Sequence, residues 1–279
     1  MMMEEATTAM PKPERLGDYQ HILVERLGRV IRIAHNRPMQ RNAEDTLLLD
    51  EMDDALAVAI RDEAAGAIII AGVGDHFSAG HDLKEAMSQR AAYTVEQRWD
   101  YEALHYYGHS LRIWDCPKPV IAQVQGACIG GAFMVANMCD LVVASDDAYF
   151  SDPVCQTLAA AAVEVLVHPW VMGLRRAKEF LFTGERMSAD EAYRIGMVNH
   201  VVPRAELEAR TYALADKIAS SPPFALRLLK RSLNRTADMQ GFRNALSAHF
   251  DTHQVTHATD ETMRIRRDGA SGAIARGRQ

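Results

Sequence analysis

A pair of glycines, Gly130 and Gly131, stands where a strand is expected to turn into a helix, and such a junction could stabilise negative charge. The run 119–125 (PVIAQVQ) has the apolar, β-branched character of a strand, and from Ala132 the residues favour a helix. Glycine lets a ligand approach the backbone closely, and the first turn of a helix presents unpaired N–H groups at its positive end. An anion or a polarised carbonyl oxygen would be stabilised there. A tight turn with close packing accounts for the same glycines equally well.

A second glycine-rich loop, Gly72–Glu85, follows the wholly apolar run Ala67–Ala71, which is typical of a strand covered on both faces. If the two strands are neighbours in a parallel sheet, both loops lie at the carboxyl ends of strands, where ligands bind. Each loop can then offer one backbone N–H to the same oxygen atom, an arrangement that stabilises the enolate or oxyanion of a thioester. Neither a phosphate-binding P-loop nor a complete dinucleotide fingerprint is present in the sequence, so a nicotinamide cofactor is not expected.

The elements around these loops predict an α/β fold. The segment His21–Ala34 alternates apolar and polar residues about a central glycine, as in a β-hairpin, and residues 43–61 form an amphipathic helix pattern. Another apolar strand is expected at 140–145, with 148–151 as its extension, and helices dominate after Ser151. Repeated strand–turn–helix units predict a mostly parallel sheet.

Composition narrows the class of protein. The chain has 279 residues, 48% of them hydrophobic, and a formal charge of −6, which argues against a nucleic-acid surface. The sequence shows no signal-peptide pattern and no apolar run long enough to span a membrane, and its four cysteines are too far apart for a CxxC pair, so a cytoplasmic protein with reduced thiols is expected. His105 and His109 share a helix face, but no third ligand is evident beside them, so no metal site is expected.

Two motifs together resemble the signature loops of the enoyl-CoA hydratase/isomerase, or crotonase, superfamily. They are FSAGHDLKE at Phe77–Glu85 and QGACIGGAFMVANMCDLVVAS at Gln125–Ser145. The likeness extends to HNRP at 35–38 and to LFTGERMSADEAYRIGMVNHVV at 181–202. The resemblance implies an α/β, crotonase-like fold with a core of repeated ββα units and a C-terminal helical segment that mediates trimerisation.

The chain is accordingly expected to divide into a disordered N-terminus at 1–19, a crotonase-like core at 20–202, a C-terminal helical domain at 203–267 and a flexible tail at 268–279. The resemblance also implies a homo-trimer or a dimer of trimers, in which the C-terminal helices pack against a neighbouring subunit.

The resemblance implies that the backbone N–H groups of His81 and Gly131 form an oxyanion hole for an acyl-CoA thioester. Coenzyme A would be part of the substrate, and no covalently bound cofactor is implied. The positions expected to contact the CoA or acyl group are Ala79, His81, Asp82, Leu83, Gly130, Gly131, Met134 and Val154. A histidine at position 81 resembles what is found in some decarboxylating members of the family. Its side chain is a candidate to replace a missing glutamate, and the alternatives are an orienting or solvent contact or no part at all. Asp82 would order the loop or cap a short helix.

The sequence departs from the family pattern at two positions. Hydratases that resemble this chain carry one glutamate three residues after the oxyanion glycine and another after a proline in the following loop. Here the two positions are Met134 and Val154. Neither side chain exchanges a proton, so the usual acid–base pair for hydration is missing.

Two nearby carboxylates are candidates to replace that pair. Glu164 lies in an apolar stretch where an unpaired carboxylate is costly. Resemblance to a dehalogenase of the family, whose catalytic carboxylate lies near this part of the chain, makes Glu164 the first candidate for a catalytic base. A buried ion pair with Arg175, Arg176 or a neighbouring subunit is the alternative. Asp152 is the second candidate, with helix capping before Pro153 as its alternative.

Two classes of function remain. One is an enzyme acting on acyl-CoA thioesters in fatty acyl metabolism, either a hydratase-like lyase, an isomerase or a decarboxylase. The other is a non-catalytic acyl-CoA binding protein, since the retained glycines and the two substitutions are compatible with both. A protein that does not bind CoA at all is a third alternative.

Overall fold

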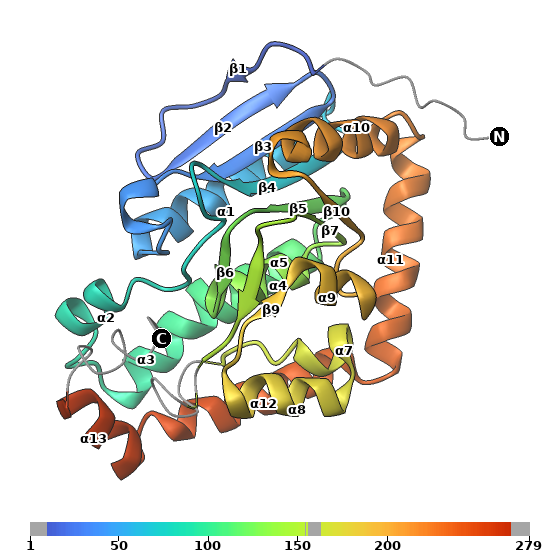
Figure 1. Cartoon of the computed structure of the whole chain (residues 1–279). Coiled ribbons are helices and arrows are strands. Elements are labelled where there is room, and N and C mark those ends of the chain that lie inside the picture. The colour runs from blue at the N-terminus through green and yellow to red at the C-terminus, as the bar shows by residue number, and fades with distance from the viewer. Residues whose placement is uncertain (1–9, 154, 156–162, 269–279) are drawn as a thin grey trace.

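The computed structural model describes residues 10–153, 155 and 163–268. Its main sheet has the order β1-β2-β3-β4-β5-β7-β10 (Figure 1). These strands are β1 (Glu14–Arg15), β2 (Ile22–Leu27), β3 (Val30–His35), β4 (Ala67–Gly72), β5 (Val120–Val124), β7 (Leu141–Ser145) and β10 (His200–Val202). Strand β2 pairs antiparallel with β1 and with β3. From β3 to β10 all neighbouring strands are parallel, as the strand–helix repeats predicted.

A second, three-stranded sheet consists of β6 (Ala127–Ile129), β8 (Tyr149–Ser151) and β9 (Met187–Ser188). The prediction that residues 148–151 extend the strand at 140–145 is therefore wrong. After β7 the chain turns, with Ala148 N–H donating to Ser145 O at 3.0 Å, and Tyr149 N–H then donates to Gly126 O at 2.8 Å. The apolar pattern of a strand does not indicate which strand it pairs with, so the sequence could not predict this turn.

The helices are α1 (Thr46–Arg61), α2 (Leu83–Gln89), α3 (Val95–Glu102), α4 (Gly108–Trp114), α5 (Gly131–Met138), α7 (His168–Met172), α8 (Leu174–Thr183), α9 (Ala189–Arg194), α10 (Leu207–Ala219), α11 (Pro223–Met239), α12 (Phe242–Thr256) and α13 (Asp260–Asp268). Short turns are the 3₁₀ segments η1 (Pro38–Gln40) and η3 (Arg204–Glu206), and the π-helical segment η2 (Ala103–Tyr107), which joins α3 to α4. Side-chain caps fix several helix starts: Asp45 accepts from Leu48 N–H at 2.9 Å, and Thr94 forms a capping box with Gln97.

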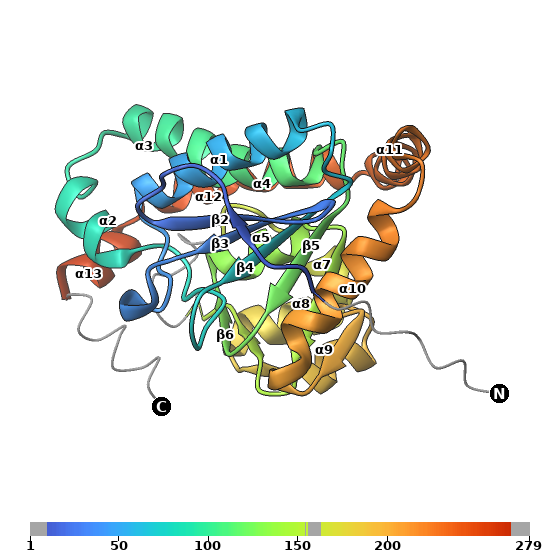
Figure 2. The same cartoon turned by 90° about the horizontal axis from the view of Figure 1, so that it is seen from above.

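Helices cover both faces of the main sheet (Figure 2). Along β4, Ile68 and Ile70 face the core that contains α1 and α5, whereas Ile69 faces the smaller core under α10, where Tyr212 is buried. This alternation explains why β4 is apolar throughout, because both of its faces are covered.

The prediction of disorder over residues 1–19 is wrong at Glu14–Arg15, which form strand β1. Glu14 and Arg15 pair with Arg26 and Glu25 of β2, and Leu16 N–H donates to Val24 O at 2.8 Å. Without this pairing β2 would be an edge strand with unpaired backbone groups, so the added strand satisfies them. Residues 1–9 and 269–279 lie outside the described residues.

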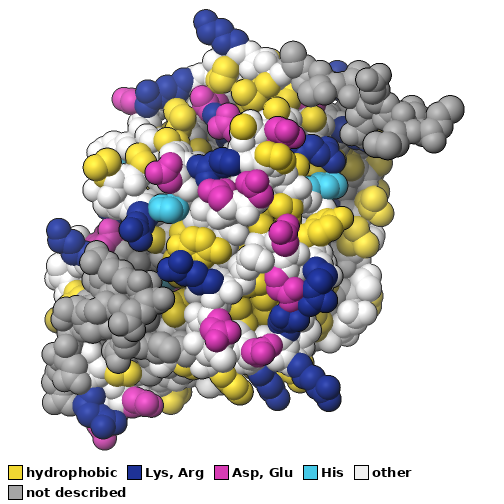
Figure 3. Space-filling model, in the orientation of Figure 1, with side chains coloured by type: hydrophobic (Ala, Val, Ile, Leu, Met, Phe, Trp, Pro, Cys, Tyr) yellow, Lys and Arg dark blue, Asp and Glu magenta, His cyan; other side chains and the backbone are white. Residues whose placement is uncertain are grey.

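The division into a core at 20–202 and a helical domain at 203–267 stays a prediction. Its second part includes α10, which packs on the main sheet, whereas α11 runs along one side of the molecule (Figure 1). Within the described residues, no helix has the length and apolar character needed to cross a membrane. On the face drawn in Figure 3, acidic and basic side chains are interspersed.

Candidate functional site

The two glycine-rich loops converge, as the sequence predicted. Strands β4 and β5 are parallel neighbours, and the loop that follows β4 runs alongside β6. Phe77 N–H donates to Gln125 O at 2.7 Å, Ser78 N–H donates to Ala127 O at 3.1 Å, and Ile129 N–H donates to Ser78 O at 3.2 Å. This short ladder places residues 79–81 against the start of α5.

Glycines at the crossing allow the close approach. Gly80 has a φ of +82°, and a Cβ atom there would lie 2.4 Å from Ile129 O and 3.2 Å from Gly131 N. Among the described residues, neither the His81 N–H nor the Gly131 N–H has a hydrogen-bond acceptor. Two such amides from adjoining loops can donate to one oxygen that gains negative charge.

The imidazole of His81 lies between two buried carboxylates. Its Nε2 hydrogen-bonds Glu164 Oε1, and its Nδ1 lies 3.1 Å from Glu44 Oε2. Burial alone would lower the pKa of His81, but the two carboxylates raise it to about 10. The raised pKa favours the imidazolium form of His81, whose Nε2–H donates to Glu164. Its Nδ1 faces Glu44 Oε2, but no hydrogen bond forms between these two atoms. A catalytic role for the His81 side chain stays a prediction.

The ring is also held on its faces. It stacks on Tyr106 with centroids 3.6 Å apart and planes inclined by 12°, and Arg90 donates to the Tyr106 hydroxyl at 3.0 Å. A Cβ atom on Gly131 would lie 2.3 Å from His81 Cε1. The imidazole thus fills the space beside the helix start that only a glycine leaves open.

Glu164 is 2% exposed and reaches the site from the segment before α7. The amide N–H of the next residue, Val165, donates to the sulfur of Met134 at 3.3 Å, so the methionine that occupies a glutamate position fixes the backbone beside Glu164. Arg176, one of the partners considered for Glu164, pairs with Glu191 at 2.5 Å. Pairing of Glu164 with a neighbouring subunit stays a prediction. The described partner of Glu164 is His81.

Asp152 lies in a separate buried pair. Its Oδ2 is 3.0 Å from His168 Nε2, and neither side chain has any exposed area. Burial raises the pKa of Asp152, and the hydrogen bond from His168 offsets part of that effect. The capping alternative depends on the residues after Pro153, most of which lie outside the described residues, as does Val154.

The other predicted positions flank His81 and Gly131. Asp82 caps α2 by accepting from Lys84 N–H at 3.0 Å and from Glu85 N–H at 3.1 Å, which confirms the capping interpretation. Leu83 is the first residue of α2. Ala79 N–H donates to Arg41 O at 3.0 Å, and Gly130 N–H donates to Ser151 O at 3.0 Å.

Sequence reasoning missed two residues that contact His81. Glu44 lies within the range predicted as an amphipathic helix, but α1 begins after it, and its side chain is 1% exposed and accepts from the Ser78 hydroxyl at 3.2 Å. No local pattern marks it, because its burial follows from pairing between residues 44 and 81. Tyr106 lies next to His105, on the helix that the sequence indicates, but its stacking on His81 was not predictable.

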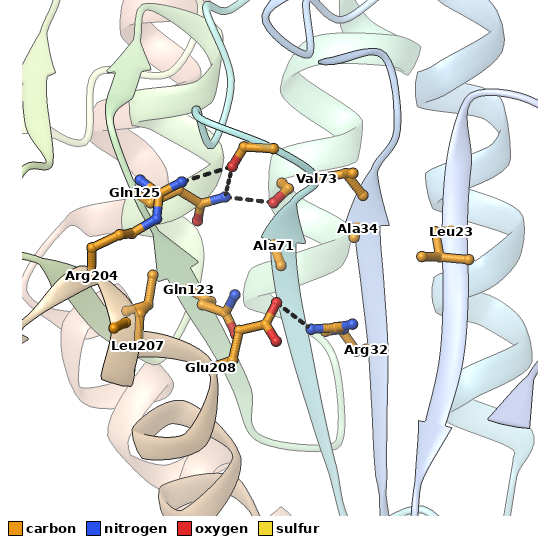
Figure 4. A pocket seen from close by; sticks show the side chains of 13 residues that line it. Leu23, Arg32, Ala34, Ala71, Val73, Gln123, Gln125, Arg204, Leu207 and Glu208 are labelled. Atoms are coloured by element: carbon orange, nitrogen blue, oxygen red, sulfur yellow. Dashed lines mark hydrogen bonds and ion pairs between the residues drawn. The ribbon is translucent and has the colours of Figure 1, made fainter. Parts of the chain in front are cut away.

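A cavity of about 340 Å³ lies elsewhere, beside β3, β4, β5 and α10 (Figure 4). Its two arginines are already engaged: Arg32 lies 3.0 Å from Glu208 Oε1, and Arg204 donates to Gly74 O at 2.8 Å. None of the predicted site residues lines this cavity, so it is distinct from the His81 site.

Comparison with known proteins gives a consistent result. The family model for enoyl-CoA hydratase/isomerase matches residues 25–269. A probable enoyl-CoA hydratase from Mycobacterium smegmatis is 46% identical, with a TM-score of 0.80 over 85% of this chain and 94% of that one. An enoyl-CoA hydratase/isomerase from Xanthobacter autotrophicus Py2 is 36% identical, with a TM-score of 0.86 over 92% of this chain and 97% of that one.

A relative with a different named reaction also matches. The 4-chlorobenzoyl coenzyme A dehalogenase-2 from Arthrobacter is 34% identical over 76% of this chain and 77% of its own length. The predicted crotonase-like α/β fold is confirmed by the solved structures. The chain therefore belongs to the enoyl-CoA hydratase/isomerase family.

Proposed function

We propose that this protein acts on an acyl-CoA thioester, whose carbonyl oxygen accepts hydrogen bonds from His81 N–H and Gly131 N–H. The observation that carries the proposal is that these two amides, on converging loops, have no acceptor among the described residues. Family membership supports it, because the named relatives act on CoA thioesters. Coenzyme A enters as part of the substrate, bound along the loop that holds Ala79, Asp82 and Leu83.

The proposed reaction is proton transfer on the acyl chain, with Glu164 as the base. The His81 imidazole donates to Glu164 and so orients that carboxylate beside the oxyanion hole. Removal of a proton next to the thioester carbonyl gives an enolate, whose oxygen the two amides stabilise. Asp152, paired with His168, is the second group proposed to exchange a proton. This chemistry serves an isomerase or a hydratase-like lyase of fatty acyl-CoA.

The alternative is a protein that binds acyl-CoA without reaction. The observation in its favour is that Glu164 is already engaged by an imidazolium, while Met134 occupies a usual glutamate position. An engaged carboxylate is a weaker base, whereas the amide pair would bind a thioester equally well in either case.

Incubation with crotonyl-CoA tests the proposal. For a hydratase, we expect catalytic loss of the enoyl-thioester absorbance and a product heavier by one water. For an isomerase, we expect a 3-enoyl-CoA, supplied as a second substrate, to be converted to the conjugated 2-enoyl isomer. Binding of butyryl-CoA, measured in parallel by calorimetry, separates the alternatives. Binding without turnover of either substrate would support the binding protein, and absence of both would contradict the acyl-CoA proposal.

We also propose a homo-trimer or a dimer of trimers. Helix α11 exposes a row of large apolar side chains, namely Phe224, Leu228, Leu229 and Leu233, each at least 45% exposed. Such a stripe is typical of a surface that a partner covers. Light scattering should give three or six times the mass of the chain, and a monomer mass would contradict the proposal.

We also propose a reducing, cytoplasmic location for this protein, because Cys116, Cys128 and Cys139 are buried free thiols.

A further inference from the structure

A buried group of three side chains lies between α3 and α12, outside the site described above. Glu102 ends α3, His253 lies in the last turn of α12, and His257 is the residue that caps the C-terminus of α12. All three are buried, with at most 8% of their surface exposed. We propose that Glu102, His253 and His257 form a binding site for a divalent transition-metal ion of the zinc class.

The distances within the group match those around such an ion. Glu102 Oε2 lies 2.9 Å from His253 Nε2 and 3.1 Å from His257 Nε2, and the two Nε2 atoms are 3.2 Å apart. A tetrahedral ion with bonds of about 2.0–2.1 Å holds its ligand atoms about 3.3 Å apart. The three atoms therefore already occupy nearly the corners that a zinc ion requires.

Hydrogen bonds alone satisfy this arrangement poorly. Gln254 Nε2 also donates to Glu102 Oε2, at 2.7 Å, so three donors converge on one oxygen that has two lone pairs. A cation lets both imidazole lone pairs and the carboxylate point at one centre.

Two neighbouring side chains bear on the choice of a fourth ligand. Arg98 approaches the other carboxylate oxygen, Oε1, at 3.7 Å, so Oε2 remains directed at the histidines. The Oε1 atom of Gln254 is buried and has no hydrogen-bond partner among the described residues. That carboxamide oxygen or a water would complete the tetrahedron.

The position of the group suggests a structural role near the His81 site. Glu102 is one turn before Tyr106, which stacks on His81. His249, one turn before His253, contacts Val163 O at 2.7 Å through Nε2, next to Glu164. A metal ion at Glu102 would therefore fix α12 against both elements that hold the buried ion pair.

Cobalt titration of the full chain, without a histidine tag and after treatment with a chelator, tests the proposal. We expect one Co²⁺ per chain, with the visible absorption of a tetrahedral complex, and its displacement by Zn²⁺. Mutation of a residue that hydrogen-bonds to a metal ligand lowers metal affinity by about 10–100-fold. Removal of a ligand itself, in His257→Ala or Glu102→Gln, should therefore lower the affinity by about 100-fold or more. The control variant His105→Ala removes a partly buried histidine that contacts Asp50, and it should bind cobalt as the wild type does.

The Glu102→Gln variant keeps the size of the side chain, so its result decides the case if His257→Ala does not fold. Zinc should raise the unfolding temperature of the wild type and leave that of Glu102→Gln unchanged. Absence of cobalt binding by the wild type, undiminished binding by Glu102→Gln, or an equal loss in His105→Ala would overturn the proposal.

Discussion

Replacement of Glu164 by glutamine is expected to lower kcat on the enoyl or acyl-CoA substrate by about 100-fold to 10,000-fold, the usual contribution of a positioned base. The amide has the same shape as the carboxylate and can still accept from His81 Nε2, so acyl-CoA affinity should change little. Steady-state kinetics together with butyryl-CoA calorimetry separates the two effects. Glu191→Gln, which removes a surface carboxylate paired with Arg176, is the matched control and should retain full activity.

The same variant has a second measurable effect, on the ionisation of His81. Glu164 raises the pKa of His81, whose value in the wild type is about 10, so its loss should lower that pKa. A group with a raised pKa stabilises the fold fully below its unfolded pKa, and that stability is lost as the pH rises through the folded pKa. Histidine NMR titration should show His81 deprotonating at a lower pH in Glu164→Gln. An unchanged titration and an unchanged kcat would contradict the assigned role.

Replacement of Gly131 by alanine is expected to disrupt the site through a single methyl group. The new Cβ would lie 2.3 Å from His81 Cε1, so the imidazole must move away from Glu44 and Glu164. Overpacking of this kind costs about 1–3 kcal/mol of stability, and misalignment of one oxyanion donor costs about 100-fold to 1,000-fold in kcat. Urea unfolding and turnover measure the two losses.

The double variant Gly131→Ala with His81→Ala distinguishes a steric clash from a general effect on the helix. If the clash with the ring is the cause, removal of the ring should restore part of the stability, and the two substitutions should be strongly non-additive. Additive losses of stability would mean that alanine perturbs the start of α5 by another route.

Much of the fold could be predicted from local pattern. The hairpin β2–β3 follows from alternation about a turn, α1 from its amphipathic spacing, and the uniform apolarity of β4 from helices on both of its faces. The segment β8 could not be assigned in this way, since its partner β6 is a strand of only three residues within a glycine-rich turn. Short strands lack the length over which periodicity is readable.

Site residues marked by a local sequence motif could be proposed from the sequence, whereas contacts between segments distant in the sequence could not. Gly131 and His81 were proposed because the two glycine-rich loops resemble the family's signature motifs, and Glu164 because it is a carboxylate in an apolar run. The partner of His81 at Glu44 depends on a bridge between distant segments, which composition does not encode. The pair His253 and His257 has helical i, i+4 spacing that could have marked it, but Glu102 is brought there only by packing of α3 on α12.

The buried imidazolium also bears on how the chain acquires its structure. His81 and Glu164 are 83 residues apart, whereas the two strands of the β2–β3 hairpin are separated only by a tight turn. Closing a long loop costs more conformational entropy than closing a short one, and this entropy is lost before the contact can stabilise the chain. The ion pair therefore belongs to the late, non-local part of assembly. Groups absent from the rate-limiting step mainly retard unfolding, so this pair contributes to the lifetime of the native state more than to the speed of its formation.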